Sequence, residues 1–512
     1  MRIRIQMVIE NEEADGTTTV TTPIEEIACL LLRDDQPQLE NLGLSLAEAK
    51  QMLASVQTQL VNAQANNYLN TKRTCPHCAK PYIPKGQQPL TFRTLFGTLK
   101  LSSPRFYTCQ CSAAQATSTT RSFSPLVKLV TERSSPELVY LQTKWASLMS
   151  YGLTSQLLAE VLPLAKPVST AVLSQNVHKV AQRSENELGE EQFIFAEGCP
   201  AEWEALPHPD APLTIGIDGG YVRGRDGADR KTGNFEVIVG KSMPQTGPNK
   251  RFGFVNSYDT KPKRCLFELL KSQGMQMNQK VIFLSDGGDT VRDLQLYLNP
   301  QAEHLLDWFH VTMRLTVLKQ YTKGLPPPKV SAEKSSKSKS KWTKEVECSR
   351  DEAEQYPSAA EIEQDLESIK WYLWHGNAYK SLQLLHDLEE DLELLEPTSS
   401  HPNQARQKLY NGVREFKGYI TANQKYIVNY GDRYRNEETI SSAFVESTVN
   451  EVISHRFVKK QQMRWTKQGV HELLQVRVAV LNEQWRETFE RWYPGMPKSQ
   501  ELKIQPELAQ VS

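Results

Sequence analysis

The sequence contains few cysteines and no long hydrophobic run. Its eight cysteines are spread over 512 residues, which is too few for a disulfide-built scaffold of this size and favours a reducing compartment such as the cytosol. No apolar stretch approaches the roughly 20 residues of a membrane-spanning helix. The first residues, MRIRIQMVIENEEADG, lack the apolar core of a signal peptide. We therefore expect a cytosolic protein without a membrane anchor.

The chain also has no net charge, but its charges are unevenly distributed. Lys+Arg and Asp+Glu each number 60, and residues 344–397 hold 15 acidic and 4 basic side chains. The remaining residues therefore hold 45 acidic and 56 basic side chains, a balance of +11. A neutral chain of this kind can still present basic surfaces to a nucleic acid. Its length argues for more than one domain.

Residues 213–310 alternate short apolar runs with helical patterns. Apolar runs bounded by Gly, Asn and Asp predict buried strands, and longer periodic stretches predict helices. Strands are expected at Leu213–Val222, Asn234–Ser242, Arg251–Tyr258, Lys280–Asp286 and Glu303–His310, and helices at Arg264–Gly274 and Asp289–Leu298. The order β-β-β-α-β-α-β predicts an α/β core with a mixed sheet, buried on both faces.

Two aspartates stand at the ends of strands in this core. The first and fourth strands can be neighbours in one sheet, and they carry Asp218 and Asp286. Carboxylates at neighbouring strand ends can share divalent cations, because hard ions such as Mg²⁺ take carboxylate and water oxygens. This arrangement suits two-metal phosphoryl transfer. The alternative is that both are turn residues, since Asp-Gly is a common turn dipeptide.

Four cysteines form two close pairs around a predicted hairpin. Cys75-Pro-His-Cys78 is followed thirty residues later by Cys109-Gln-Cys111. The alternating stretch between them has a Phe-Gly turn and predicts a β-hairpin. The pattern favours a structural zinc ribbon, with His77 as a substitute ligand or buried free thiols as alternatives. The basic residues nearby suit phosphate contacts or a solvated face: Arg73, Arg93, Lys100 and Arg105.

A helical region follows the hairpin. Residues 151–183 contain a helix, a turn near Pro163–Pro167 and a second helix that starts near Ser169 with a capping signal. This pattern fits a helix–turn–helix with Ser169–Arg183 as the recognition helix, although ordinary helical hairpins share it. The candidate DNA contacts are Ser169, Thr170, Gln175 and His178. His178 is interpreted as a groove-facing or surface residue and not as a metal ligand.

The stretch from residue 440 to residue 482 combines one candidate carboxylate with basic residues. Helical spacing places Glu446, Asn450, Ile453 and Phe457 on one face. A helix here can deliver Glu446 to the two aspartates, with Glu451, Glu437 and Glu438 as competing candidates. Basic residues beside a carboxylate site favour a nucleic-acid substrate. The candidate DNA-contacting residues of this stretch are Arg456, Lys459, Lys460 and Arg464.

These motifs together resemble a bacterial insertion-sequence transposase of the DDE class, of the ISKra type and akin to Mutator-like elements. The residues that carry the resemblance are IDGGYVR around Asp218, FLSDGGDTV around Asp286, DWFHVTMRL around Asp307 and His310, and FVESTVNEVISHRFVKKQQMRW around Glu446. The resemblance implies a ribonuclease-H-like core and a metal-binding triad of Asp218, Asp286 and Glu446. It also implies an all-helical insertion at about residues 311–439.

The Asp307-x-x-His310 motif matches an element that Mutator-like enzymes carry after the second aspartate. It is interpreted as an orienting pair, as a contact to DNA near the cut phosphate, or as a packed Asp–His pair. The cofactors implied are two Mg²⁺ ions, or Mn²⁺ in their place, and a structural Zn²⁺. The partners implied are double-stranded DNA, as element ends and as target, and further copies of the chain.

The sequence therefore predicts seven segments. They are an N-terminal region (1–70), a zinc ribbon (71–121), a helix–turn–helix region (122–210), the first part of the core (211–310), the helical insertion (311–439), a helix region that completes the core (440–490) and a tail (491–512). The predicted function is metal-dependent cleavage and joining of DNA strands in the bacterial nucleoid. A DNA-binding regulator and a nuclease that only hydrolyses are the alternatives.

Overall fold

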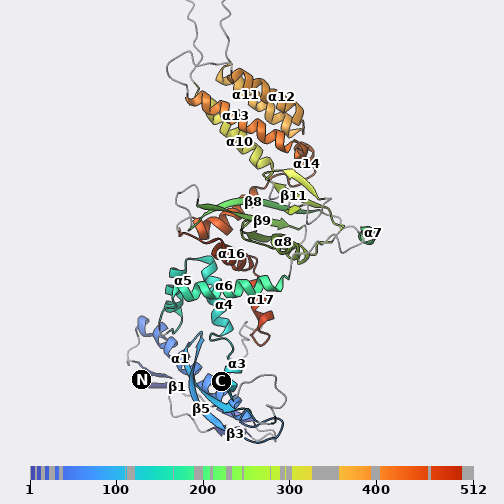
Figure 1. Cartoon of the computed structure of the whole chain (residues 1–512). Coiled ribbons are helices and arrows are strands. Elements are labelled where there is room, and N and C mark those ends of the chain that lie inside the picture. Colours follow the sequence, from blue (N-terminus) through green and yellow to red (C-terminus); the bar gives the residue numbers. More distant parts are fainter. Residues whose placement is uncertain are drawn as a thin grey trace, which may run out of the picture. The chain divides into compact units, whose positions relative to one another are not determined.

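The structure is a computed structural model in which the chain divides into two compact units (Figure 1). One unit comprises Met1–Glu187 and Glu472–Ser512, and the other Leu188–His471. The residues that the structure describes are 2–5, 9–12, 18–21, 29–33, 38–109, 111, 122–164, 166–189, 200–207, 212–225, 233–244, 247–276, 278–288, 294–295, 302–325, 357–393, 404–458 and 463–498. The finer division into seven segments stays a prediction.

The first unit begins with short strand pairs and a long helix. Strands β1 (Arg2–Ile5) and β4 (Cys29–Leu32) pair antiparallel, as do β2 (Ile9–Glu12) and β3 (Thr18–Thr21). A short 3₁₀ helix, η1 (Leu39–Asn41), precedes α1 (Leu46–Thr71). Helix α1 starts where Ser45 and Glu48 cap each other's backbone N–H groups.

The hairpin predicted between the cysteine pairs is present. Strands β5 (Pro84–Thr94) and β6 (Gly97–Tyr107) pair antiparallel, and β7 (Ser122–Phe123) adds to β6. The turn lies between Thr94 and Gly97, and Gly97 has φ of 138°, a backbone angle that glycine adopts readily. Leu90, Leu99 and Leu101 are buried on one face, against α1 and α3 (Pro125–Leu129). Exposed Arg93 and Lys100 alternate with these leucines.

Further helices of the first unit lie in its described residues, and one of them, α16, begins in the second unit and enters the first at Glu472. Helices α4 (Pro136–Leu148), α5 (Tyr151–Val161) and α6 (Thr170–Glu187) pack together around Leu138, Leu158 and Leu173. Near the C-terminus, the chain forms α16 (Lys467–Leu481) and α17 (Trp485–Trp492). Within this unit, Arg477 donates to the Ser147 carbonyl over 2.5 Å, and Trp485 donates to Thr143 over 3.2 Å. These contacts tie the C-terminal helices to α4.

The second unit contains a five-stranded mixed sheet. Its strands are β8 (Leu213–Arg223), β9 (Asn234–Met243), β10 (Lys250–Phe254), β11 (Val281–Ser285) and β12 (Glu303–Leu306). The order across the sheet is β10-β9-β8-β11-β12. The first three strands pair antiparallel, and β11 and β12 run parallel to β8. The predicted mixed sheet is present, and the first and fourth strands are direct neighbours.

The two faces of the sheet are covered by different helices. On one face, Leu213, Ile215 and Ile217 of β8 belong to a buried cluster with Leu266 and Leu270 of α8 (Pro262–Lys271). Every residue of β11 is buried, as expected for a strand covered on both sides. On the other face lie α15 (Ala443–Val449) and a π-helical stretch, η4 (Asn450–Val458).

Two glycines of β8 let α15 and η4 approach the second face closely. A Cβ atom on Gly216 would lie 2.2 Å from Cγ2 of Val445, and one on Gly220 would lie 2.7 Å from Cδ1 of Ile453. Residues at alternate positions of a strand share a face, so Gly216, Asp218 and Gly220 face α15 and η4 together. The glycines therefore bring helical backbone next to Asp218.

A helical bundle follows β12. It contains α10 (Trp308–Thr322), α11 (Ala359–Trp374), α12 (Ala378–Glu393) and α13 (Gln404–Asn423) around one apolar core. The leucines at positions 385, 388 and 392 are buried in it, so the acidic block uses its apolar stripe for helix packing. The described residues of this unit also form α7 (Pro200–Glu204), η3 (Gln424–Tyr426) and α14 (Tyr430–Arg435).

Some predicted boundaries in the second unit were wrong. The strand expected to carry Asp307 and His310 ends at Leu306, because the Asp307 side chain accepts the Phe309 N–H at 3.0 Å and begins α10. The strand expected over residues 251–258 ends at Phe254. Most of the helix expected at residues 289–298 lies outside the described residues.

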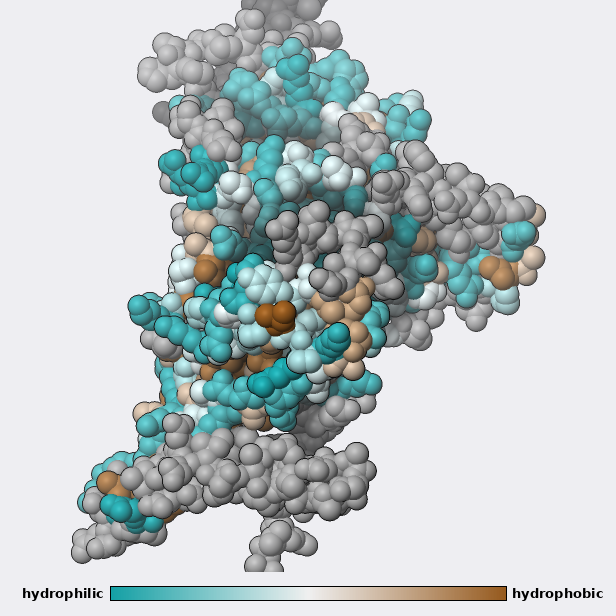
Figure 2. Space-filling model, turned by 60° about the horizontal axis from the view of Figure 1, so that its bottom comes forward, coloured by the Kyte–Doolittle hydropathy of each residue, from teal (hydrophilic) through white to brown (hydrophobic). Residues whose placement is uncertain are grey.

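Exposed apolar side chains of the described residues form small groups among hydrophilic ones (Figure 2). Within those residues, no helix has both the length and the apolar character needed to cross a membrane. Scattered apolar residues of this kind are ordinary on a protein surface.

We predict that Gly216→Ala destabilises the second unit. The added methyl group would overlap Val445 and Phe444, and such overpacking costs about 1–3 kcal/mol. Chemical denaturation of the variant measures this loss. Gly219→Ala is the matched control, because its Cβ atom would lie 3.4 Å from the nearest atom, in the Glu236 side chain. Equal stability of the two variants would contradict the close approach of α15.

Candidate functional site

The pairing of β8 with β11 brings Asp218 and Asp286 side by side. The two strands run parallel with Leu284 beside Gly216. Two residues further along each strand, Asp286 follows directly after β11, next to Asp218. Neighbouring strands lie about 4.8 Å apart, so the two carboxylates are close enough to interact.

A third aspartate continues this row. Strands β11 and β12 pair with Ser285 beside Leu306, and the next residue on each strand is Asp286 and Asp307. Leu284 and Leu305 share a buried cluster with Phe444 of α15, so the row lies on the same face of the sheet as this helix. Three carboxylates on three neighbouring strands thus face α15.

Asp218 and Asp286 each use only one oxygen for hydrogen bonding in the described part of the chain. Oδ1 of Asp218 accepts the Gly219 N–H at 2.7 Å, and Oδ1 of Asp286 accepts the Gly288 N–H at 3.1 Å. The turn after Asp286 requires Gly287, whose φ is 87°. The second oxygen of each carboxylate is available as a ligand for a hard divalent cation.

The electrostatics of Asp218 reflect this crowding. Partial burial raises the pKa of its carboxyl group above the ordinary value, and the nearby Asp286 and Asp307 raise it further. The Gly219 N–H and His310 act in the opposite direction. Like charges held together away from water disfavour ionisation, so a bound cation would relieve the repulsion in this row.

Asp307 differs from the other two aspartates because it is fully buried and its oxygens are occupied. Oδ1 accepts the Ser442 N–H at 2.8 Å in addition to that of Phe309, and Oδ2 accepts the Ser442 hydroxyl. Nε2 of His310 lies 3.6 Å from Oδ2. Asp307 therefore connects the start of α10 to the segment that enters α15, which favours the packed Asp–His pair among the interpretations of this motif.

Glu446 lies on α15 at the level of Asp218 but does not join the aspartates in this structure. It follows Val445, which covers Gly216, and its side chain is exposed. In the described ranges, the only group of at least three potential ligands with ligand atoms within 4.8 Å of one another is formed by cysteines. Asp218, Asp286 and Glu446 are therefore not drawn together to that distance.

The predicted face of this helix was wrong. Ile453 and Phe457 are buried while Glu446 is exposed, because the chain changes from α to π geometry at Asn450 and this shifts the spacing. Two competing carboxylates already have partners. Glu451 pairs with Arg251 at 2.8 Å, and Glu438 pairs with Arg433 at 2.9 Å. Because Glu451 and Glu438 already have partners, Glu446 is the better candidate for a third metal ligand.

The four cysteines of the hairpin region form a compact cluster that can bind a metal such as zinc. Sγ of Cys75 lies 3.4 Å from that of Cys111, and Sγ of Cys109 lies 3.5 Å from that of Cys78 and 3.1 Å from that of Cys111. Tetrahedral zinc with Zn–S bonds of about 2.3 Å sets its sulfurs about 3.8 Å apart. The set of ligands fits zinc, and His77 lies outside the cluster.

Proton sharing among these thiols perturbs their titration. A hydrogen bond with Cys111 lowers the pKa of Cys109, and the hydrogen bond with Cys109 raises the pKa of Cys111 to about 12. Zinc binds thiolates, so metal binding here would release the shared protons.

We predict that Cys75→Ser and Cys109→Ser each abolish stoichiometric zinc binding, because each removes one of four thiolate ligands. The zinc content of the purified protein, measured by elemental analysis, is expected to fall from about one ion per chain to near zero. Cys265→Ser is the control, since Cys265 lies outside the cluster. Full zinc content in either cluster variant would contradict the assignment.

The predicted helix pair is present in the first unit. Helix α6 begins at Thr170, where the Ser169 hydroxyl accepts the Val172 N–H at 3.4 Å. Thr170 and Gln175 are exposed. Nδ1 of His178 lies 2.6 Å from the buried Glu472 carboxylate. The use of this helix for DNA recognition stays a prediction.

The basic residues around η4 have different surroundings. Arg456 is fully buried, with its guanidinium 5.2 Å from the centre of the Trp465 ring. The prediction that it contacts DNA is therefore not supported, because it packs in the core. Lys459 and Lys460 lie outside the described residues. Arg464 is exposed.

Backbone pairing brings Arg464 close to Arg223, the last residue of β8, and to Arg225, two residues beyond it. The Arg225 N–H donates to Trp465 at 2.8 Å, and the Trp465 N–H donates to Arg223 at 3.0 Å. All three arginines are exposed. Arg223 lies five residues beyond Asp218, or about 16 Å along the strand. The proximity of the two segments depends on tertiary pairing, which residue spacing does not reveal.

The bundle contributes three residues near the aspartates that the sequence analysis missed. Arg314 lies one helical turn beyond His310 on α10, and Tyr419 and Asn423 lie at the end of α13. The four-residue spacing from His310 to Arg314 could have indicated that the two side chains share one face of the helix. No local pattern marks the other two, since they reach the site by tertiary packing.

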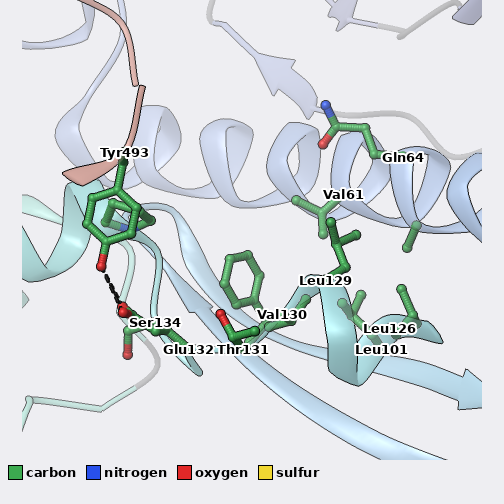
Figure 3. A pocket seen from close by; sticks show the side chains of 13 residues that line it. Val61, Gln64, Leu101, Leu126, Leu129, Val130, Thr131, Glu132, Ser134 and Tyr493 are labelled. Atoms are coloured by element: carbon green, nitrogen blue, oxygen red, sulfur yellow. Dashed lines mark hydrogen bonds between the residues drawn. The ribbon is translucent and has the colours of Figure 1, made fainter. Parts of the chain in front are cut away.

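The first unit contains an apolar cavity of about 340 Å³. Val61 and Gln64 of α1 form one wall, and Leu101 and Leu126 form another (Figure 3). The Tyr493 hydroxyl donates to Glu132 at 2.8 Å, and burial raises its pKa to about 12. None of the predicted site residues lines this cavity.

Comparisons with known proteins find only a weak structural similarity. No protein-family model matches the chain, and no curated protein matches it significantly. Among solved structures, a chain of the Drosophila P element transposase strand transfer complex matches with a TM-score of 0.29 and 10% identity, over 69% of this chain and 93% of that one. A similarity this weak establishes neither a shared fold nor a shared function.

We predict that Asp218→Asn raises the melting temperature at pH 7 in a chelator. A carboxyl whose pKa is raised by folding binds its proton more tightly in the folded state, so stability falls as pH rises through the raised pKa. The variant removes this penalty, and its advantage should shrink at acidic pH. Glu236→Gln, on the opposite face of the sheet, should change little. A variant less stable than wild type at pH 7 would contradict the prediction.

Proposed function

We propose that the chain is a metal-dependent transposase that cuts DNA at the ends of a mobile element and joins them to a target. The observation that carries the proposal is the pairing of β8 with β11, with Asp218 and Asp286 on one face of the sheet. A ribonuclease-H-like core, implied by the sequence resemblance, needs this adjacency of its first and fourth strands. Glu446, on the helix that covers the same face, supplies the third carboxylate.

The residues present fit divalent cations, because both aspartates keep an oxygen without a protein partner in the described chain. Two magnesium ions, or manganese in their place, would lower the pKa of an attacking hydroxyl and stabilise charge on the attacking and leaving oxygens. Asp218 and Asp286 would hold them. Glu446 would swing in as a ligand that orients the attacking water, since its exposed side chain is free to turn.

The reaction would proceed in two displacements at the same residues. Water first attacks the phosphodiester at the element end and the 3′-oxygen leaves, taking up a proton. The freed 3′-hydroxyl then attacks a target phosphodiester and displaces a second 3′-oxygen. The protein's own part is to position strands. Exposed Arg223, Arg225 and Arg464 would bind backbone phosphates, with Arg223 about 16 Å along the strand from Asp218.

DNA-end recognition would come from the zinc-binding hairpin and from α6. Helix α6 exposes Thr170 and Gln175, side chains that can hydrogen-bond base edges in a major groove. The hairpin carries Arg93 and Lys100 on its exposed face. Because phosphate contacts supply affinity and base contacts supply specificity, loss of the zinc site should weaken end binding.

We predict that Asp218→Asn, Asp286→Asn and Glu446→Gln each lower the cleavage rate by at least about 10³-fold while end binding stays near wild type. The measurement is incubation of purified protein with its own element ends and Mg²⁺, followed by gel analysis of cut and joined products. Glu451→Gln is the matched control on the same helical segment, because Glu451 is paired with Arg251. Normal cutting by Glu446→Gln would show that the third ligand is misassigned.

The same assay separates the proposal from its two alternatives. Cut products without any joined product, even when free 3′-ends are supplied, would identify a nuclease that only hydrolyses. Binding without cutting by wild type would identify a DNA-binding regulator, with the aspartates as turn residues.

A further inference from the structure

Arg314 places a positive charge against Tyr419, which also lies near Asp286 and Asp307, and it has no ion-pair partner among the described residues. It lies seven residues after Asp307 and four after His310, on the same face of α10. Its Nε atom is buried and has no hydrogen-bond partner. The residue as a whole is half-buried, and polar atoms removed from water are ordinarily paired, so the guanidinium has capacity to bind an anion.

Tyr419 of α13 holds the guanidinium in place. The Arg314 Cζ atom lies 4.3 Å from the centre of the Tyr419 ring, which is within the distance for a cation–π contact. Stacking covers a face of the planar group, and its N–H edge stays available for a phosphate. The tyrosine hydroxyl is also near the aspartates, because Asp286 and Asp307 both raise its pKa, which burial raises most.

Asn423 fixes the end of α13 against the turn after Asp286. A Cβ atom on Gly287 would lie 2.2 Å from Oδ1 of Asn423, so the amide rests on the glycine. Nδ2 of Asn423 donates to the Tyr419 carbonyl at 3.0 Å, and the side chain is 5% exposed. Helix α13, whose Tyr419 stacks against Arg314, is therefore in contact with the turn that follows Asp286.

We propose that Arg314 binds a non-bridging oxygen of the DNA phosphate that is cut and so positions it over Asp218 and Asp286. This inference rests on the proposed function and deepens it. It makes the helical bundle a part of the site, since Arg314 comes from α10 and the Tyr419 ring that it stacks on comes from α13. A phosphate bound to metal ions at the aspartates can also accept hydrogen bonds from a guanidinium, so it can bridge the two kinds of charge.

The test compares wild type with Arg314→Ala on element-end duplexes that carry either a normal phosphate or a neutral methylphosphonate at the boundary of the element. Binding is measured by fluorescence anisotropy in Ca²⁺, and cleavage by single-turnover rates in Mg²⁺. On normal DNA, Arg314→Ala should lose about 10²–10³-fold in cleavage rate, as expected for removal of a charge-stabilising donor. Its binding should also be weaker.

On methylphosphonate DNA, the difference between the two proteins should shrink to within about threefold in both assays, because the charge that Arg314 binds is gone. Arg314→Lys should lose part of the rate, since it keeps the charge but not the planar stack. Arg414→Ala is the matched control: it removes an exposed arginine of α13 and should behave alike on both substrates. Melting temperatures check that the variants are folded.

Each outcome decides the inference. A phosphate-dependent binding difference without cutting by wild type would support the role of Arg314 and remove the proposed enzymatic activity. Equal losses on both substrates, or no loss on either, would overturn the inference, because a residue with only a packing role cannot sense the charge of one phosphate.

Discussion

The buried carboxylate of Asp307 holds the second unit together at the point where its parts meet. The backbone N–H of Asp307 donates to the Ser285 carbonyl at the end of β11. Its side chain caps α10 and accepts hydrogen bonds from both the N–H and the hydroxyl of Ser442. A carboxylate removed from water requires such partners. The sheet, the bundle and the helix that carries Glu446 therefore share one anchor, about one strand spacing from Asp286.

The sheet was predictable from the sequence because its strands are short apolar runs whose ends are marked by glycine, asparagine and aspartate. The hairpin between the cysteine pairs was predictable for a similar reason, from its alternating residues and its Phe-Gly turn. These features depend on local chemistry that can be seen within about ten residues. The adjacency of Asp218 and Asp286 was one possibility that the sequence allowed, and the pairing of β8 with β11 realises it.

Other features depend on contacts between distant segments. Arg456 was expected at the surface because it is charged, but it is buried against Trp465. The face of the helix after Glu446 was wrong because π geometry begins at Asn450, which residue spacing alone does not reveal. Tyr419 and Asn423 reach the aspartates through the packing of the bundle. Nothing in their neighbourhood in the chain marks them.

The two glycines on either side of Asp218 have a consequence for recognising related chains. Both are on the face of β8 that α15 and η4 cover, and at both positions a methyl group would overlap a side chain of those elements. A strand that presents a carboxylate beneath a closely packed helix therefore has a recognisable sequence pattern, Gly-x-Asp-x-Gly. This pattern can be sought in other sequences, where it would indicate the covering helix as well as the aspartate.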